Sequence, residues 1–260
     1  MPVPRNTLKA ALAQGQVQIG LWVGLAHPLI AEMAASAGFD WCLIDAEHGP
    51  NTLRDVLGQL QAIGDRAAPV VRVAANEPWL LKQVLDLGAQ TVLVPMVESA
   101  EEAARAVAAC RYPPDGIRGV AAPIVRASGY GAVADYATTA NDEICVIVQV
   151  ETQNAAGQID AIAAVEGVDA VFIGPADLSA DMGFPGRPTE PEVLAEIDRL
   201  IGRIRAAGKA AGIIQYDAAA VARYAAAGVT FIGAGSDAGL VAATFRAVAC
   251  SAREALASGI

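Results

Sequence analysis

Residues 91–110, TVLVPMVESAEEAARAVAAC, pass from a short apolar run rich in valine into a longer alanine-rich segment. The short run predicts a buried strand, and the longer segment has the period of a helix. This pairing of strand and helix repeats eight times along the chain. Alternating strands and helices are typical of a parallel sheet, and eight units in 260 residues predict a (β/α)8 TIM barrel with a closed sheet.

The alternative architecture is an open, doubly wound sheet, but no GxGxxG motif follows the first expected strand. Because no linker or change of composition divides the chain, we expect one domain over residues 1–260. The expected strands are 19–25, 41–47, 69–74, 91–97, 144–151, 170–178, 209–215 and 231–237. The expected helices are 28–37, 51–64, 77–87, 99–110, 153–165, 191–207, 217–227 and 237–257.

One connection, the loop at about 112–140, is much longer than barrel connections usually are. It follows a helix, so its ends should lie at the bottom of the barrel, away from the catalytic end. To serve an active site it must climb along the barrel or reach a neighbouring subunit. Its Arg126 is a candidate for binding an acidic or hydroxylated substrate tail, and a solvated arginine is the alternative.

Composition narrows the function classes. The chain is 54% hydrophobic and 18% charged, which suits a compact protein and not a disordered one. Its net charge of −10 repels phosphate backbones and argues against nucleic acid as a partner. We find no signal peptide, no membrane-spanning run and no CxxC spacing, and we expect a reduced, cytoplasmic protein without membrane contact. The cysteines are Cys42, Cys110, Cys145 and Cys250.

Polar residues stand where several expected strands end, and in a TIM barrel these ends form the active site. Glu151 shares a strand face with Gln149, while Val146, Val148 and Val150 occupy the opposite face. The alternative is a closed polar plug in which these side chains only pair with one another. Trp22, between two glycines on its face, is either the floor of the site or core filling. The residues at these strand ends are Asp45, Glu47, His48, Arg72, Gln149, Glu151 and the segment Gly174, Pro175, Ala176 and Asp177.

Two carboxylates from adjacent strands, Glu151 and Asp177, suggest a hard metal such as Mg²⁺ or Mn²⁺. A general acid/base pair of the glycosidase kind is the alternative. The chain has only three lysines, at positions 9, 82 and 209, and none is placed for the mouth. A Schiff base requires a lysine there, so metal-assisted chemistry is favoured over imine chemistry. His48, at a strand end, is the candidate general base.

Several motifs together resemble the class II, metal-dependent pyruvate aldolases, whose type members act on 4-hydroxy-2-oxoheptanedioate and 2-dehydro-3-deoxyglucarate. The resemblance runs from about Gly20 to Asp237, and the ordered combination of IDAEH, VQVE and GPADLS is specific. The motifs are GFDWCLIDAEHGPN (38–51), LKQVLDLGAQTVLVPMVESAEEA (81–103), RYPPDGIRGV (111–120), VQVET (148–152) and FIGPADLSADMGFPG (172–186).

The resemblance implies a hexamer of paired barrels, a trimer of dimers, with the last helix exchanged between partners. It implies Mg²⁺, Mn²⁺ or Co²⁺ on Glu151 and Asp177, with pyruvate held by Gln149 and the backbone at Ala176 and Asp177. It further implies that Arg72 stabilises the enolate and that His48 is the base. The family's aspartate partner for the histidine matches Asp86, which lies near the end of a helix and far from the mouth; Asp45 is the local alternative.

The implied reaction is reversible cleavage of a 4-hydroxy-2-oxo acid into pyruvate and an aldehyde. The aldehyde stays open, with succinic semialdehyde, tartronate semialdehyde, glycolaldehyde and lactaldehyde all compatible. One rival is a barrel that handles phosphoenolpyruvate or an enolate in another reaction type. The other is a metal-binding barrel without catalysis. Exchange of solvent deuterium into the methyl group of pyruvate, with and without metal, separates the three.

Overall fold

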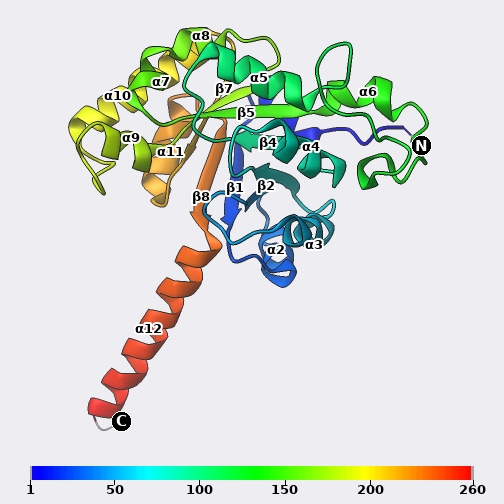
Figure 1. Ribbon diagram of the computed structural model, residues 1–260. Coiled ribbons are helices and arrows are strands. Elements are labelled where there is room, and N and C mark those ends of the chain that lie inside the picture. The colour runs from blue at the N-terminus through cyan, green and yellow to red at the C-terminus, as the bar shows by residue number, and fades with distance from the viewer. Residues whose placement is uncertain (1, 259–260) are drawn as a thin grey trace.

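The computed structural model describes residues 2–258, and in them eight parallel strands close into a barrel in sequence order (Figure 1). The closing contact joins the first strand to the last, with Gly20 beside Gly233. This closure excludes the open sheet and confirms the predicted TIM barrel. The strands are β1 (Gln18–Val23), β2 (Trp41–Asp45), β3 (Ala68–Arg72), β4 (Thr91–Val94), β5 (Cys145–Val150), β6 (Ala170–Ile173), β7 (Ala210–Ile214) and β8 (Phe231–Ser236).

The strands bury both faces, as the continuous apolar runs require. Val146, Val148 and Val150 of β5 pack outward, in the large cluster between sheet and helices. Ile147 faces inward, in a second cluster that fills the barrel with aromatic rings. Gly20 is needed here, because a β-carbon at this position would lie within 2 Å of the Trp41 ring.

Most helices and strands occupy the expected ranges, but one expected helix and one expected strand differ. The segment expected as one helix over 153–165 forms two short helices on either side of Gln158. The strand expected over 170–178 ends at Ile173, because Pro175 starts a helix in which its missing N–H is not needed. The helices that follow the strands are α2 (Pro28–Ala35), α3 (Leu53–Ile63), α4 (Pro78–Asp86), α5 (Ala100–Cys110), α7 (Gln153–Gly157), α8 (Ile159–Ala163), α9 (Pro175–Asp181), α10 (Pro191–Ala206), α11 (Ala218–Ala226) and α12 (Asp237–Ala257).

The sequence patterns missed α1 (Thr7–Ala13), η1 (Arg126–Ser128) and α6 (Tyr136–Glu143). The last two lie in or beside the long loop, which folds around a small core of its own made of Tyr112, Val133, Tyr136 and Ala140. Arg126 donates from Nη1 to the carbonyl of Leu87, just after α4 ends, at 2.6 Å. Helices of a barrel end at its bottom, so within one chain Arg126 lies away from the catalytic end.

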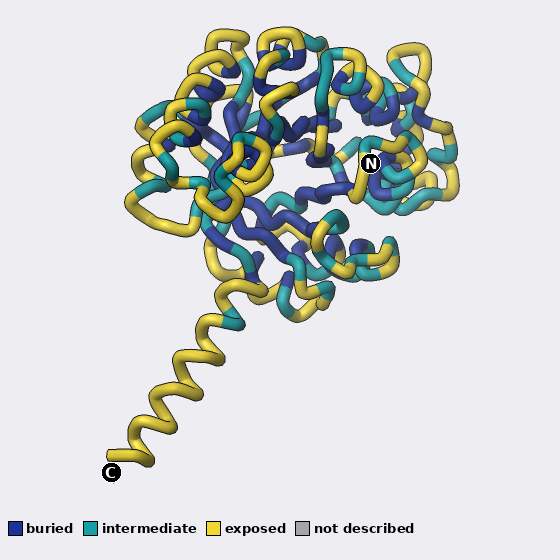
Figure 2. Tube along the Cα trace, turned by 60° about the vertical axis from the view of Figure 1, so that its left-hand side comes forward, coloured by how far each residue is buried: buried dark blue, intermediate teal, exposed yellow. Residues whose placement is uncertain are grey.

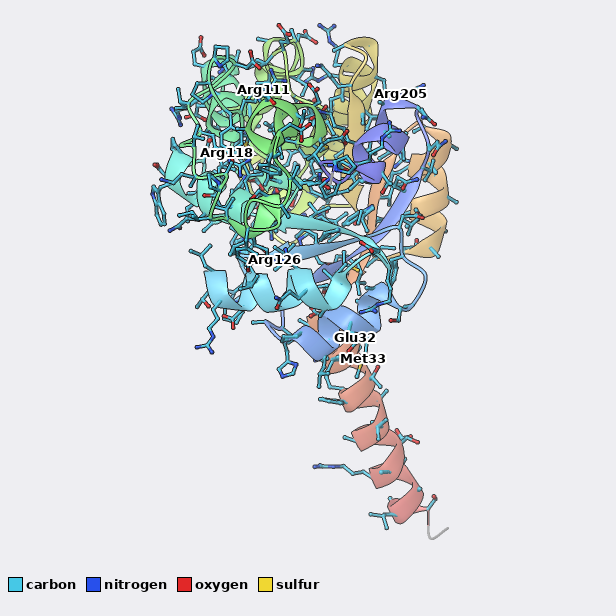
Figure 3. All side chains as sticks on the ribbon, turned by 90° about the vertical axis from the view of Figure 1, so that its right-hand side faces the viewer. Glu32, Met33, Arg111, Arg118, Arg126 and Arg205 are labelled. Carbon is cyan, nitrogen blue, oxygen red and sulfur yellow. The ribbon has the colours of Figure 1, made fainter. Side chains whose placement is uncertain are left out.

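Helix α12 leaves the barrel and projects from it along most of its length (Figures 1 and 2). Asp237 is its one buried residue, while Phe245 is 70% and Leu256 is 80% exposed. Glu32 and Met33 of α2 lie at the same end of the barrel as this helix (Figure 3). No helix in the described part of the chain is both long and apolar enough to span a bilayer.

Candidate active site

A cavity of about 430 Å³ opens at the carboxyl ends of the strands, where the barrel fold places its chemistry. Trp22 lies at its floor, in ring contact with Phe172 at 5.3 Å between centroids, so it both fills the core and borders the cavity. The candidate residues that line it are Trp22, Asp45, His48, Arg72, Gln149, Gly174, Pro175, Ala176 and Asp177.

Arg72 is held by two carboxylates from the end of β2. Asp45 stands next to it in the sheet register and accepts from Nε at 2.9 Å and from Nη2 at 2.6 Å. Glu47 lies 2.8 Å from the remaining nitrogen, Nη1. Burial by itself lowers the pKa of Arg72, but the hydrogen bonds and charge of Asp45, with the charge of Glu47, outweigh it and raise that pKa. The guanidinium is thus a fixed positive charge in the cavity wall.

His48 follows this pair in the turn after β2. Its backbone N–H donates to Oδ1 of Asp45 at 3.2 Å, so Asp45 fixes the turn that carries the histidine. The imidazole itself is 68% exposed, and its Nε2 lies 4.0 Å from Oε2 of Glu47. The ring therefore stands at the open side of the cavity, where a proton can reach it.

Glu151, directly after β5, is buried and held at both oxygens. Oε1 accepts from the backbone N–H of Met96 at 2.9 Å, and Oε2 accepts from the side chain of Gln149. Burial and the nearby charges of Asp177 and Glu47 raise the pKa of Glu151 to about 7, against the lowering effect of its hydrogen bonds. The carbonyl oxygen of the Gln149 side chain is buried without a hydrogen-bond partner in the described residues.

Asp177 lies in the first turn of α9, and not at a strand end as the sequence pattern indicated. Its charge acts on both Glu151 and Glu47, so three carboxylates lie near one another at the carboxyl ends of the strands, and Asp177 borders the cavity. Among residues 2–258 no cluster of three or more histidine, cysteine or acidic side chains has the geometry of a closed metal site. The donor set instead fits an open site, in which two carboxylates would hold a hard cation and substrate and water would supply the other oxygens.

Asp86 lies elsewhere. At the end of α4 its Oδ1 accepts from Nη2 of Arg118 at 2.7 Å. Arg118 is fully buried and lies 4.3 Å from the centre of the Tyr112 ring, on the side of the barrel away from α12 (Figure 3). Within one chain the structure therefore does not bring Asp86 to His48, and only a second subunit could do so.

Sequence reasoning assigned no role to Glu47 or Asp237. Burial raises the pKa of Glu47, and the charge of Arg72 opposes this shift. Asp237 is 4% exposed and borders the cavity where β8 passes into α12. Both residues could have been selected from the sequence, because each is an acidic residue at the end of an expected strand.

The sequence model of the HpcH/HpaI aldolase/citrate lyase family matches residues 18–244. A hydroxypyruvate/pyruvate aldolase of Agrobacterium fabrum is 52% identical over 249 residues, 95% of this chain and 94% of that protein. A 4-hydroxy-2-oxo-heptane-1,7-dioate aldolase of Salmonella enteritidis PT4 is 53% identical over 246 residues, 94% of each chain. The crystal structure of an HpcH/HpaI aldolase/citrate lyase family protein from Burkholderia cenocepacia has a TM-score of 0.91 at 42% identity, covering 95% of this chain and 99% of that one.

Proposed function

The chain belongs to the HpcH/HpaI aldolase/citrate lyase family and is a pyruvate aldolase, and from this premise we propose how its cavity works. The reaction is reversible cleavage of a 4-hydroxy-2-oxo acid into pyruvate and an aldehyde. The observation that supports this assignment is the grouping of three carboxylates, Glu47, Glu151 and Asp177, near a fixed arginine at the carboxyl ends of the strands.

Glu151 and Asp177 hold the divalent cation in this proposal, and Mg²⁺, Mn²⁺ and Co²⁺ all suit the two carboxylates. The excess of negative charge that raises the pKa of Glu151 is the charge a cation would neutralise. When bound, the metal supplies a Lewis acid for the 2-oxo group of pyruvate.

The chain's own residues then bind and orient the substrate. Arg72 places fixed positive charge where the enolate oxygen develops, and its two carboxylate partners keep it from moving. Gln149 and the turn from Gly174 to Asp177 hold the carboxylate and keto oxygen of pyruvate. Trp22 closes the floor and excludes water from below.

His48 is the general base that moves the proton in this proposal, because its imidazole stands at the open side of the cavity and histidine is the side chain that most often acts as a general base. Asp45 positions it by fixing its backbone. Asp86 raises its basicity only if a neighbouring subunit delivers that carboxylate to the ring.

We further propose a homohexamer, a trimer of dimers, in which α12 is exchanged between paired subunits. A stripe of exposed apolar side chains on a projecting helix is unstable in water and is typical of an interface. A cytoplasmic location is consistent with four unpaired cysteines. The apolar residues of the stripe are Leu240, Phe245, Val248 and Leu256.

Exchange of solvent deuterium into the methyl group of pyruvate tests the proposal. The metal-loaded protein should exchange the methyl protons without any aldehyde, and the metal-free protein should not. A phosphoenolpyruvate-handling barrel would turn over its own substrate without this exchange, and an inactive metal-binding barrel would show neither activity. Absence of exchange in the metal-loaded protein would refute the assignment.

A further inference from the structure

The imidazole of His48 is not fixed by hydrogen bonds of its own. Within residues 2–258 the ring makes none, and its Nε2 lies 4.0 Å from Oε2 of Glu47, beyond hydrogen-bond distance. The position of the ring therefore depends on the backbone of the turn that carries it, which runs from Asp45 at the end of β2 to Gly49.

This turn is tightly folded. The carboxylate of Asp45 accepts the backbone N–H groups of Glu47 at 3.1 Å and His48 at 3.2 Å. Gly49 closes the turn, and a β-carbon at position 49 would lie 2.4 Å from the carbonyl oxygen of Asp45 and 3.0 Å from that of Gly24. Because the turn has no spare room, the position of the Asp45 carbonyl decides the path of the backbone that follows it.

A side chain from beyond the turn holds that carbonyl. Asn51 donates from Nδ2 to the carbonyl oxygen of Asp45 at 2.7 Å. Gln59, in the second turn of α3, donates from Nε2 to Oδ1 of Asn51 and also to the carbonyl of Asp55 at 3.1 Å. The bond from Gln59 keeps the amide of Asn51 oriented so that its NH₂ group faces Asp45. Helix α3 thus anchors the amide, and the amide anchors the turn.

Gln59 occupies a position where an apolar residue would be more stable. Its side chain is fully buried, and its Oε1 has no hydrogen-bond partner within the described residues. The other buried residues of this helix are Val56, Leu60 and Ile63. An unpaired buried acceptor costs about 1–3 kcal/mol, which a leucine of similar size would avoid. A local departure from good packing of this kind is typical of a residue retained for function.

Resting on the proposed aldolase function, we infer that Asn51 and Gln59 are positioning residues for His48. Gln59 orients the amide of Asn51, Asn51 fixes the carbonyl of Asp45, and the turn then presents the imidazole to the methyl group of pyruvate. Both residues lie outside the lining of the cavity and touch neither proposed metal ligand. Their removal should therefore slow proton transfer and leave the binding of metal and pyruvate intact.

Asn51→Ala tests this on the full chain loaded with Mn²⁺. We expect kcat and the rate of deuterium exchange into pyruvate to fall by about 10- to 100-fold, with KM for pyruvate and Kd for Mn²⁺ within about twofold of wild type. The matched control is Gln90→Ala, directly before β4 at the opposite end of the barrel. Its amide likewise donates to a backbone carbonyl, that of Pro4 at 2.6 Å, and its loss should leave kcat unchanged.

Gln59→Leu separates positioning from stability. It removes the unpaired buried oxygen, so the unfolding temperature should stay the same or rise, while kcat should still fall. A purely structural role would change the unfolding temperature and leave kcat at the wild-type value. Because Gln59 acts through Asn51, the double variant should be no slower than Asn51→Ala alone.

The His48→Ala background tests whether the effect passes through the imidazole. Asn51→Ala should cause no further loss of exchange there, since no base remains to be positioned. An equal loss with and without His48, or wild-type kcat in folded Asn51→Ala, would overturn the inference. Circular dichroism verifies folding, and Gln59→Leu decides the question if Asn51→Ala does not fold. Absence of exchange in the wild-type protein refutes the aldolase proposal itself, whereas full exchange in the wild type and in both variants refutes this inference alone.

Discussion

Gly174 touches Glu151 across the ends of β6 and β5, and a β-carbon at position 174 would lie 2.6 Å from Oε2 of that carboxylate. Glu151 cannot move aside freely, because Met96 and Gln149 hold its two oxygens. Close backbone approach at this point is therefore part of what orients the proposed metal ligand.

Gly174→Ala should weaken Mn²⁺ binding by roughly 10- to 100-fold, the usual effect of disturbing a ligand's support. Isothermal titration calorimetry measures this directly. The matched control is Gly202→Ala in α10, where a β-carbon meets no atom within 4 Å and a helical alanine should stabilise the fold by about 0.5–1 kcal/mol. Equal Mn²⁺ affinity in Gly174→Ala and wild type would contradict the assigned role.

Removal of metal should abolish activity reversibly. Excess chelator should stop aldol turnover, and Mg²⁺, Mn²⁺ or Co²⁺ should restore it. Glu151→Gln keeps the shape but removes one ligand charge, so excess metal should restore it only in part. Borohydride with pyruvate should leave the mass of the protein unchanged, because none of the lysines, all of which lie in residues 2–258, lines the cavity. A borohydride-trapped adduct, or full activity in chelator, would overturn the metal mechanism.

The metal-free protein should lose stability as pH rises toward neutrality. Glu151 has a pKa of about 7 in the folded chain against 4.5 ordinarily, so the folded state binds its proton more tightly. The resulting stability is fully present below about pH 4.5 and is lost as pH rises through about 7. Thermal unfolding between pH 5 and 8 should show this fall in wild type and not in Glu151→Gln.

The same proton competes with the cation. Because a carboxylate must be deprotonated to bind metal, the Kd for Mn²⁺ should rise as pH falls below about 7, by up to about tenfold per pH unit. A Kd that is constant from pH 5 to 8 would show that Glu151 is already ionised without metal.

His48→Ala should lose roughly 10²–10⁴-fold in aldol turnover while still binding Mn²⁺ and pyruvate, since it removes the base and no ligand. Asp86→Asn serves as the comparison. If a neighbouring subunit brings Asp86 to His48, this variant should lower turnover and shift the pH profile of kcat. If Asp86 only pairs with Arg118, it should lower the unfolding temperature without moving that profile. Wild-type proton exchange in His48→Ala would remove His48 from the mechanism.

Light scattering at micromolar concentration should give a mass well above the 26.6 kDa of one chain. Phe245→Asp, in the exposed stripe of α12, should shift the protein toward smaller species, because it places a charge in the proposed interface. Arg253→Asp on the same helix changes charge outside the stripe and is the control. A wild-type monomer would end the proposal of an exchanged helix.

Hydrophobic periodicity was enough to predict the barrel and the inward face of β5, because few folds bury both faces of every strand in a parallel sheet. The position of Asp177 was harder to predict, because its segment is apolar enough for a strand. The helix begins there because Pro175 suits the first turn of a helix. The partners of Asp86 and Arg126 could not be predicted, since both depend on how the long loop folds back on α4. Such contacts join distant parts of the chain and produce no periodic pattern in the sequence.

The aromatic rings inside the barrel also determine by which route substrates reach the cavity. Trp22, Trp41, Phe172 and Phe231 lie in mutual contact beneath the cavity, with Trp41 and Phe231 stacked at 4.0 Å. This plug of rings closes the barrel below the cavity, so both substrates must enter and leave through the mouth at the carboxyl ends of the strands.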